Sequence, residues 1–329
     1  MSCFDPIYLE GVVDPDTGYI QYNYKGRAKY ENPLEFGSID DLATKGTFRV
    51  LVPCGRCLGC HIDYSREWAN RMIVELQDNP LAIFVTLTYN NAHLKYGPSD
   101  NPTLDVRDTQ LFFKRLRKAY SDKRIRYYLA GEYGPTTLRP HYHAIIYGLS
   151  MSDFDDLRIV GRNELGQLYY SSPRFESIWG QGFVQLSPVT YRTCAYVSRY
   201  VLKKHHSQDR DFTKRQVKPE FNVSSRKPGI GMLHATDMVM SGNTSFSIPC
   251  PDGVRQVYLP KAFIRHAKND LINAGKSIDF ITELVYNRSK QAKARLDSSL
   301  LYSEQSYLEY LNSQEAKLAG KIKLLPERK

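Results

Sequence analysis

Two histidines separated by one residue could bind a metal ion. His141 and His143 flank Tyr142 and precede the apolar run of residues 144–147. In a strand, side chains alternate between the two faces, so both imidazoles would project from one face while Tyr142 points the other way. Two neutral imidazoles on one face suit a divalent metal ion. For this motif alone, a pair of surface or hydrogen-bonded histidines is at least as good an interpretation.

Two tyrosines further along the chain could act as nucleophiles. Tyr196 and Tyr200 lie in the segment YVSRYVLK, which has the pattern of a helix, and residues four apart lie on one helix face. A tyrosine that attacks phosphorus becomes covalently linked to the nucleic acid and conserves the bond energy for rejoining. A metal-binding strand and such a helix together indicate cleavage and rejoining of a phosphodiester backbone. The alternative is a core helix whose aromatic side chains pack inward.

A cation follows each tyrosine after three residues. Arg199 follows Tyr196, and Lys203 follows Tyr200. These cations could hold phosphate oxygens or lower the pKa of the phenol, which is ordinarily about 10. Successive four-residue units of a helix are rotated by only about 40°, so each tyrosine could bring its own cation to one shared metal site.

A carboxylate could complete that metal site. Glu132 follows a strand expected at residues 125–131, and pairing of this strand with residues 141–147 would bring Glu132 to the histidine face. Two histidines and a carboxylate suit Mg²⁺ or Mn²⁺ when water and phosphate oxygen supply the other ligands. A metal ion there would polarise the scissile phosphate. The alternative is a solvated glutamate at a strand end.

Three of the six cysteines lie within seven residues. Cys54, Cys57 and Cys60, followed at once by His61, could supply ligands to Zn²⁺. An iron–sulfur cluster could use the same thiolates, but no fourth ligand is evident for it in the sequence. The alternative is a set of reduced thiols in a turn before the next helix.

The elements that must position these residues form an α+β pattern. Strands are expected at residues 81–89, 125–131, 141–147 and 182–186, and helices at 61–77, 108–120 and about 190–204. Residues 153–175 indicate a short helix and an insertion, residues 245–259 a hairpin, and the remainder charged helices. We predict a central, mainly antiparallel sheet flanked by helices, with a helical C-terminal extension. We divide the chain into an N-terminal arm (1–50), a core with the cysteine cluster and a basic loop (51–231), and a hairpin with helices (232–329).

The charge balance favours a polyanionic partner. The 329 residues contain 45 Lys and Arg against 35 Asp and Glu, a formal net charge of +10. Many of these cations lie between residues 192 and 227, where Lys204, Arg226 and Lys227 could contact the phosphates of single-stranded DNA. A solvated basic loop is an equally good interpretation of any single residue there.

Membranes and nucleotides are not expected among the partners. The sequence has no apolar run of the length that crosses a bilayer, and its N-terminus lacks the features of a signal peptide. We therefore expect an intracellular protein. The sequence also has no G-x-x-x-x-G-K-[ST] motif, so a helicase activity would have to come from another protein.

Three segments in order resemble the motifs of HUH endonucleases: residues 84–89, 140–143 and 196–203. The motif with two tyrosines is similar to that of rolling-circle replication initiators of small single-stranded DNA phages. Residues 52–60 and 225–231 resemble the gokushovirus branch of the Microviridae. The resemblance covers about residues 52–231 and implies the HUH endonuclease fold.

The resemblance also implies roles for particular residues. The two histidines would hold the divalent metal ion, and the two tyrosines would be the nucleophiles. Glu132 stands near the position where relatives often place a third ligand, and Lys203 matches the lysine that closes the third motif. Arg199 departs from the pattern, since lysine is common there, but it keeps the charge.

The implied activity is a site-specific cycle of nicking and closing at an origin of replication. One tyrosine nicks the viral strand, leaving a 5′-phosphotyrosine and a 3′-hydroxyl for the host DNA polymerase, and the second tyrosine later cleaves the regenerated origin. Such a protein would work with a host helicase in the cytoplasm of the infected bacterium. The alternatives are an HUH transposase or relaxase, and a DNA-binding or packaging protein without enzymatic activity.

Overall fold

The computed structural model of this protein describes residues 3–13, 20–33, 47–134, 136–162, 166–206, 212–250, 252–303 and 305–323. Only the backbone is described for residues 47–48, 200–206, 303 and 323. Chain contacts divide the protein into two compact units, one comprising Met1–Tyr64 with Ile278–Lys329 and the other Ser65–Ser277. The division of the sequence into three parts remains a prediction.

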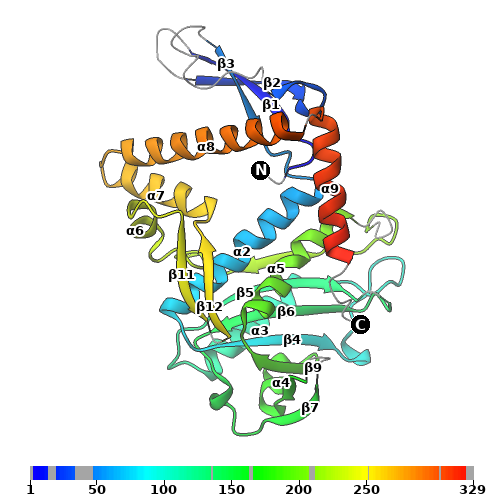
Figure 1. The fold of residues 1–329 in the computed structure, drawn as a ribbon. Coiled ribbons are helices and arrows are strands. Elements are labelled where there is room, and N and C mark those ends of the chain that lie inside the picture. Colours follow the sequence, from blue (N-terminus) through cyan, green and yellow to red (C-terminus); the bar gives the residue numbers. More distant parts are fainter. Residues whose placement is uncertain are drawn as a thin grey trace. The chain divides into compact units, whose positions relative to one another are not determined.

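A seven-stranded sheet forms the centre of the unit Ser65–Ser277 (Figure 1). Neighbouring strands in it are antiparallel throughout. In spatial order the strands are β10 (Phe221–Ser224), β5 (Arg126–Tyr133), β6 (Pro140–Tyr147), β4 (Ala82–Tyr89), β9 (Gly182–Pro188), β8 (Leu168–Ser171) and β7 (Arg158–Arg162). The predicted α+β class with a mainly antiparallel central sheet is therefore confirmed.

Strands β7 and β8 correct one expectation from the sequence. They extend the sheet within residues 153–175, where we expected a short helix and an insertion. Strand β7 is mostly exposed, and its sequence RIVGR lacks the alternation of apolar and polar residues that marks a half-buried strand. The strand is therefore stabilised by its ladder with β8 more than by burial.

One face of the sheet carries the main hydrophobic core. Helices α3 (Val106–Ala119) and α4 (Pro173–Trp179) contribute to this core, and α4 packs against both α3 and β9. Phe112 and Phe113 of α3 are fully buried against alternate residues of β4 and β6. Complete burial of such a side chain contributes about 1.5–3 kcal/mol. Asp105 begins α3 by accepting a hydrogen bond from the Arg107 N–H.

The opposite face of the sheet meets helices α2 (Leu58–Asp78) and α5 (Tyr191–His206). Helix α5 packs against β5 and β6 (Figure 1). The rings of Trp68 and Tyr128 lie 4.8 Å apart, and the Tyr147 hydroxyl donates a 2.9 Å hydrogen bond to the Met72 carbonyl. Tyr147 shares its strand face with the two histidines of β6, so the predicted site lies on the α2 and α5 side of the sheet.

Helices and a hairpin complete this unit. Strands β11 (Ser245–Cys250) and β12 (Gly253–Tyr258) pair as the hairpin that the sequence predicts. Helices α6 (Ala235–Met240) and α7 (Lys261–Asn273) pack against each other.

The other unit contains a small sheet and two long helices. Its strands β1 (Ile7–Val13), β2 (Ile20–Arg27) and β3 (Thr47–Val52) pair antiparallel with β1 in the centre. Helices α8 (Asp279–Ser303) and α9 (Tyr307–Lys323) confirm the predicted helical C-terminal region. A small core combines Ala28 with side chains of both helices: Leu300, Tyr307 and Leu311. None of the helices that the structure describes is long and apolar enough to cross a membrane.

Candidate metal and nucleophile site

The register of β5 and β6 brings three predicted ligands together. Glu132 lies directly opposite His141, and both project from the sheet face that His143 shares. The Nε2 atom of His141 lies 2.7 Å from Oε1 of Glu132, and that of His143 lies 3.2 Å from the same oxygen. One ligand atom from each residue lies within 4.8 Å of the other two. These three side chains could therefore hold a metal ion.

Burial and hydrogen bonding keep the Glu132 carboxylate ionised. Glu132 and His143 are buried, whereas His141 is half-buried. Burial disfavours the charge, but hydrogen bonds from His141 and His143 outweigh it and hold the pKa of Glu132 well below its usual range. A carboxylate with two imidazoles is a donor set that suits Mg²⁺ or Mn²⁺.

The outer nitrogen of each histidine is already engaged. The Nδ1 atom of His141 lies 3.1 Å from the Arg139 carbonyl oxygen, and that of His143 lies 2.9 Å from Oγ1 of Thr86. A carbonyl can only accept, so Nδ1 of His141 donates, and a neutral ring turns its Nε2 lone pair toward Glu132. A lone pair and a carboxylate oxygen repel at 2.7 Å unless a proton or a metal ion lies between them. The arrangement thus fits a metal site.

Tyr196 lies against the histidine pair. Its ring centroid is 5.1 Å from that of His143, at an angle of 78°, and 6.1 Å from that of Phe84. The Phe84 ring stacks on His143 from the neighbouring strand, with centroids 5.8 Å apart. On the adjoining part of α5, Ser198 is fully buried and its hydroxyl lies 3.0 Å from that of Ser65 in α2. Helix α5 is therefore fixed with its first tyrosine beside the predicted ligands.

The other residues of the third motif lie on the same helix. Tyr200 and Lys203 belong to α5, but their side chains lie outside the described residues, as does that of Lys204. Arg199 is exposed, and its Nε donates a 3.3 Å hydrogen bond to the Ala195 carbonyl. The structure thus places Tyr196 beside the histidines and leaves Arg199 accessible to a ligand.

Comparison with known proteins relates this chain to a family. A family of replication-associated proteins, described by the name ORF2, matches residues 82–205. The chain is 31% identical over 279 residues to "Replication-associated protein ORF2" of Spiroplasma virus 4, an alignment that covers 83% of this chain and 84% of the relative. The chain belongs to this family of replication-associated proteins.

Two further replication-associated proteins of phages show the same relationship. The similarity to "Replication-associated protein VP4" of Bdellovibrio phage phiMH2K is 35% identity over 187 residues, or 54% of this chain and 56% of the relative. "Replication-associated protein ORF4" of Chlamydia phage 1 is 30% identical over 215 residues, or 64% of this chain and 52% of the relative. No solved structure matches the chain. The predicted relationship to phage replication proteins is confirmed.

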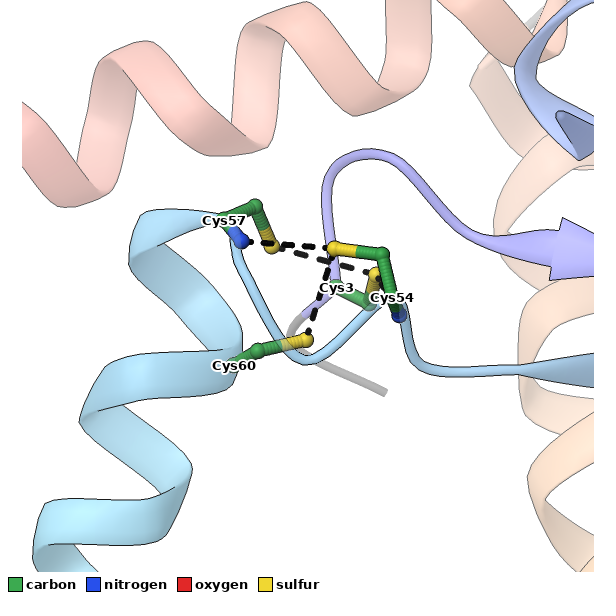
Figure 2. Close-up of side chains that lie close together, drawn as sticks. All are labelled: Cys3, Cys54, Cys57 and Cys60. Carbon is green, nitrogen blue, oxygen red and sulfur yellow. Dashed lines mark hydrogen bonds between the residues drawn. The ribbon is translucent and has the colours of Figure 1, made fainter. Parts of the chain in front are cut away.

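A second group of potential ligands in this replication-associated protein lies in the unit Met1–Tyr64. Cys3 joins Cys54, Cys57 and Cys60, and the four sulfurs lie within 4.8 Å of one another (Figure 2). Our sequence interpretation missed Cys3, which lies 51 residues before Cys54. A signal was present, because three clustered cysteines usually need a fourth ligand and few other cysteines were available.

The predicted DNA contacts Arg226 and Lys227 line a basic pocket. The pocket has a volume of about 350 Å³ and lies where β10 ends and β5 begins. Its other lining residues are Arg117, Arg124, Ile125, Arg126, Tyr127, Ser224 and Ser225. The pocket combines cationic side chains and hydroxyls without a carboxylate, a composition that favours phosphate.

A buried ion pair supports one wall of this pocket. Arg126 pairs with Glu75 of α2 and donates hydrogen bonds to the carbonyls of Pro228 and Gly229, at 3.0 and 3.1 Å. Glu75 also accepts a 2.6 Å hydrogen bond from the Gly231 N–H. Gly231 has a φ of 68°, and a Cβ there would lie 2.5 Å from the Arg71 carbonyl oxygen, so only glycine fits. The segment after Lys227 is thus structural.

Proposed function

We propose that this replication-associated protein is a site-specific, single-strand DNA endonuclease and strand transferase that starts and ends rolling-circle replication. The observation that carries the proposal is the contact of Tyr196 with His143 in a cluster of two histidines and a carboxylate. A phenol beside a metal site is the arrangement needed to form a phosphotyrosine bond.

Glu132, His141 and His143 would hold Mg²⁺ or Mn²⁺, with water and a phosphate oxygen as the other ligands. A metal ion bound there would polarise the scissile phosphate and neutralise charge that develops in the transition state. The hydrogen bonds from Thr86 and to the Arg139 carbonyl would orient the two imidazoles toward it.

The chemical step is a transesterification. The tyrosine gives up its phenolic proton to solvent, its oxygen bonds to phosphorus, and the bond from phosphorus to the 3′ oxygen breaks. The leaving 3′ oxygen takes up a proton, which yields a 5′-phosphotyrosine and a free 3′-hydroxyl. In the reverse direction a 3′-hydroxyl attacks the phosphotyrosine and rejoins the strand, so no external energy source is needed.

The two tyrosines would act in alternation. Tyr200 follows Tyr196 by one helical turn, so a small shift of α5 or of the DNA would exchange them at the metal site. Arg199 and Lys203 would each hold a phosphate oxygen for one of the two tyrosines. The first tyrosine nicks the origin, and the second cleaves the regenerated origin and allows the genome to be closed.

The DNA would also contact the basic segments. The pocket at Arg226 and Lys227 would bind backbone phosphates away from the reacting bond, and Lys204 would contribute near the tyrosines. A host helicase and the host DNA polymerase would supply unwinding and synthesis in the cytoplasm of the infected bacterium. Transposition and relaxase activity use the same chemistry, but the names of the relatives favour replication.

Cleavage of an origin oligonucleotide tests the proposal. We expect a covalent adduct that carries the label of the 3′ fragment, depends on Mg²⁺ or Mn²⁺, and is absent from the double variant Tyr196→Phe, Tyr200→Phe. Tyr302→Phe, at a tyrosine that is 95% exposed, is the matched control. Adduct formation by the double variant would overturn the nucleophile assignment. DNA binding without any cleavage would support the DNA-binding or packaging alternative.

A further inference from the structure

We propose that Cys3, Cys54, Cys57 and Cys60 bind one structural zinc ion. The sulfurs of Cys54 and Cys60 lie 3.9 Å apart, and those of Cys57 and Cys3 lie 3.8 Å apart. Zinc binds thiolates tetrahedrally at about 2.3 Å, which places the sulfurs about 3.8 Å from one another. The four sulfurs thus surround a space of the size of one zinc ion (Figure 2).

Backbone amides around the cluster are arranged to stabilise thiolates. The N–H groups of Phe4 and Cys54 point at the sulfurs of Cys57 and Cys3, each at 3.2 Å. The sulfur of Cys54 receives two further N–H groups, from Arg56 at 3.4 Å and Cys57 at 3.3 Å. Hydrogen bonds of this kind orient metal ligands and offset their negative charge. They support ligation rather than accidental proximity.

Local backbone conformation brings the first two ligands of the C-x-x-C segment together. Gly55 has a φ of 73°, a left-handed conformation that glycine adopts without strain. The turn lets Cys54 and Cys57 face one point, while Cys60 enters from the first turn of α2. Cys3 comes from the opposite end of the sequence of this unit and closes the set.

The composition of the site indicates a structural ion. All four ligands are sulfur, so zinc would have no open position for a substrate. Cys3 is 2% exposed and Cys60 is 9% exposed, which further restricts access. Disulfides would need sulfurs about 2.05 Å apart and are rare in a reducing cytoplasm. A cluster of several irons and sulfides would need more room than this spacing leaves.

The zinc ion would fasten the segment before β1 to the start of α2. Asp5, two residues after Cys3, pairs with Arg27 at 2.6 Å and with Lys29 at 3.5 Å. These contacts tie the metal-bound segment to the end of β2 and to η1 (Ala28–Tyr30), whose Ala28 belongs to the small core with α8 and α9. Small cores commonly depend on a metal or a disulfide for stability. We therefore expect zinc to stabilise this unit rather than act in cleavage.

Metal analysis of the full chain tests the inference. The protein, purified under reducing conditions without chelator, should contain one zinc ion per chain. A mercurial reagent should release it in the presence of a zinc-sensitive dye. Cobalt substituted for zinc should give the charge-transfer and ligand-field bands of tetrahedral thiolate coordination. These measurements use the wild-type protein, so they do not depend on whether a variant folds.

Variants identify the ligands. Cys3→Ser and Cys57→Ser should lose the zinc and the cobalt bands, whereas Cys250→Ser, at a half-buried cysteine outside the cluster, should keep both. His143→Ala should also keep the zinc, which separates this site from the one proposed for cleavage. Wild-type protein with free thiols and no metal, with disulfides, or with iron would overturn the inference. So would full zinc content in Cys3→Ser.

Discussion

The Tyr196 ring meets the His143 ring nearly edge to face, with their centroids 5.1 Å apart. The two residues lie 53 positions apart in the sequence, on a helix and on a strand that the sheet brings into contact. Phe84 completes the contact by stacking on His143 and meeting Tyr196 with its edge. This relationship turns two separate sequence motifs into one candidate site.

Single tyrosine variants should separate the two steps of the cycle. If Tyr196 performs the first cleavage, Tyr196→Phe should lower nicking of a single origin by at least about a thousandfold, because no other group replaces the nucleophile. Tyr200→Phe should then keep nicking but fail to transfer the strand between two origins. Equal losses in both assays for both variants would contradict alternation.

Removal of the Thr86 hydroxyl should weaken the metal site without removing a ligand. Thr86→Val keeps the shape of the side chain but loses the hydrogen bond to Nδ1 of His143. Loss of such a contact typically lowers metal affinity by about 10–100-fold. Calorimetric titration with Mn²⁺ measures the change, and His234→Ala, at an exposed histidine paired with Asp78, should leave it unaltered. Unaltered affinity in Thr86→Val would argue against ligation by His143.

The stability of the protein without Mg²⁺ or Mn²⁺ should depend on pH through Glu132. The folded state holds the pKa of Glu132 below its unfolded value of about 4.3, so unfolding takes up a proton at low pH. Its contribution to stability is therefore present above the unfolded pKa and is lost as the pH falls. Denaturant unfolding from about pH 6 to about pH 3 should show a smaller loss for Glu132→Gln than for the wild type. A parallel loss would exclude this linkage.

The Tyr142 hydroxyl should stabilise the strand that carries the histidines. It accepts a 2.8 Å hydrogen bond from the Asp105 N–H and lies 2.7 Å from the Tyr89 hydroxyl, which donates to Asp108. Tyr142→Phe leaves a buried N–H without this acceptor and should lower the free energy of unfolding by about 1–3 kcal/mol. The exposed Tyr302→Phe should have no measurable effect in the same denaturant titration. An unchanged free energy in Tyr142→Phe would contradict this role.

The basic pocket should contribute a salt-sensitive part of DNA affinity. Neutralising Arg226 and Lys227 together should weaken binding to single strands of any sequence and reduce the slope of log affinity against log salt by about 1–2. Lys268→Ala, at an exposed lysine of α7, removes a charge outside the pocket and serves as control. Fluorescence anisotropy over a range of salt concentrations measures both slopes. Identical slopes for all three proteins would exclude the pocket from the DNA path.

Much of the architecture could be predicted because its signals are local. The apolar strand at residues 82–89, the His-x-His strand and the helix with two tyrosines each carry their own periodicity, and all three form as expected. The short edge strand Phe221–Ser224 and the exposed strand Arg158–Arg162 lack such a signal. Pairing with β5 and β8 decides their conformation, and pairing is a property of the assembled sheet.

The sequence by itself determined which chemical groups this protein has, their spacing along each element, and its membership of a family of phage replication proteins. Only the tertiary structure decided which groups meet. The β5–β6 register brings Glu132 to the histidines, and the packing of α5 brings Tyr196 to them. Cys3 joins three cysteines from which 51 to 57 residues separate it in the chain. Such contacts depend on long-range pairing and packing, so no local pattern of residues encodes them.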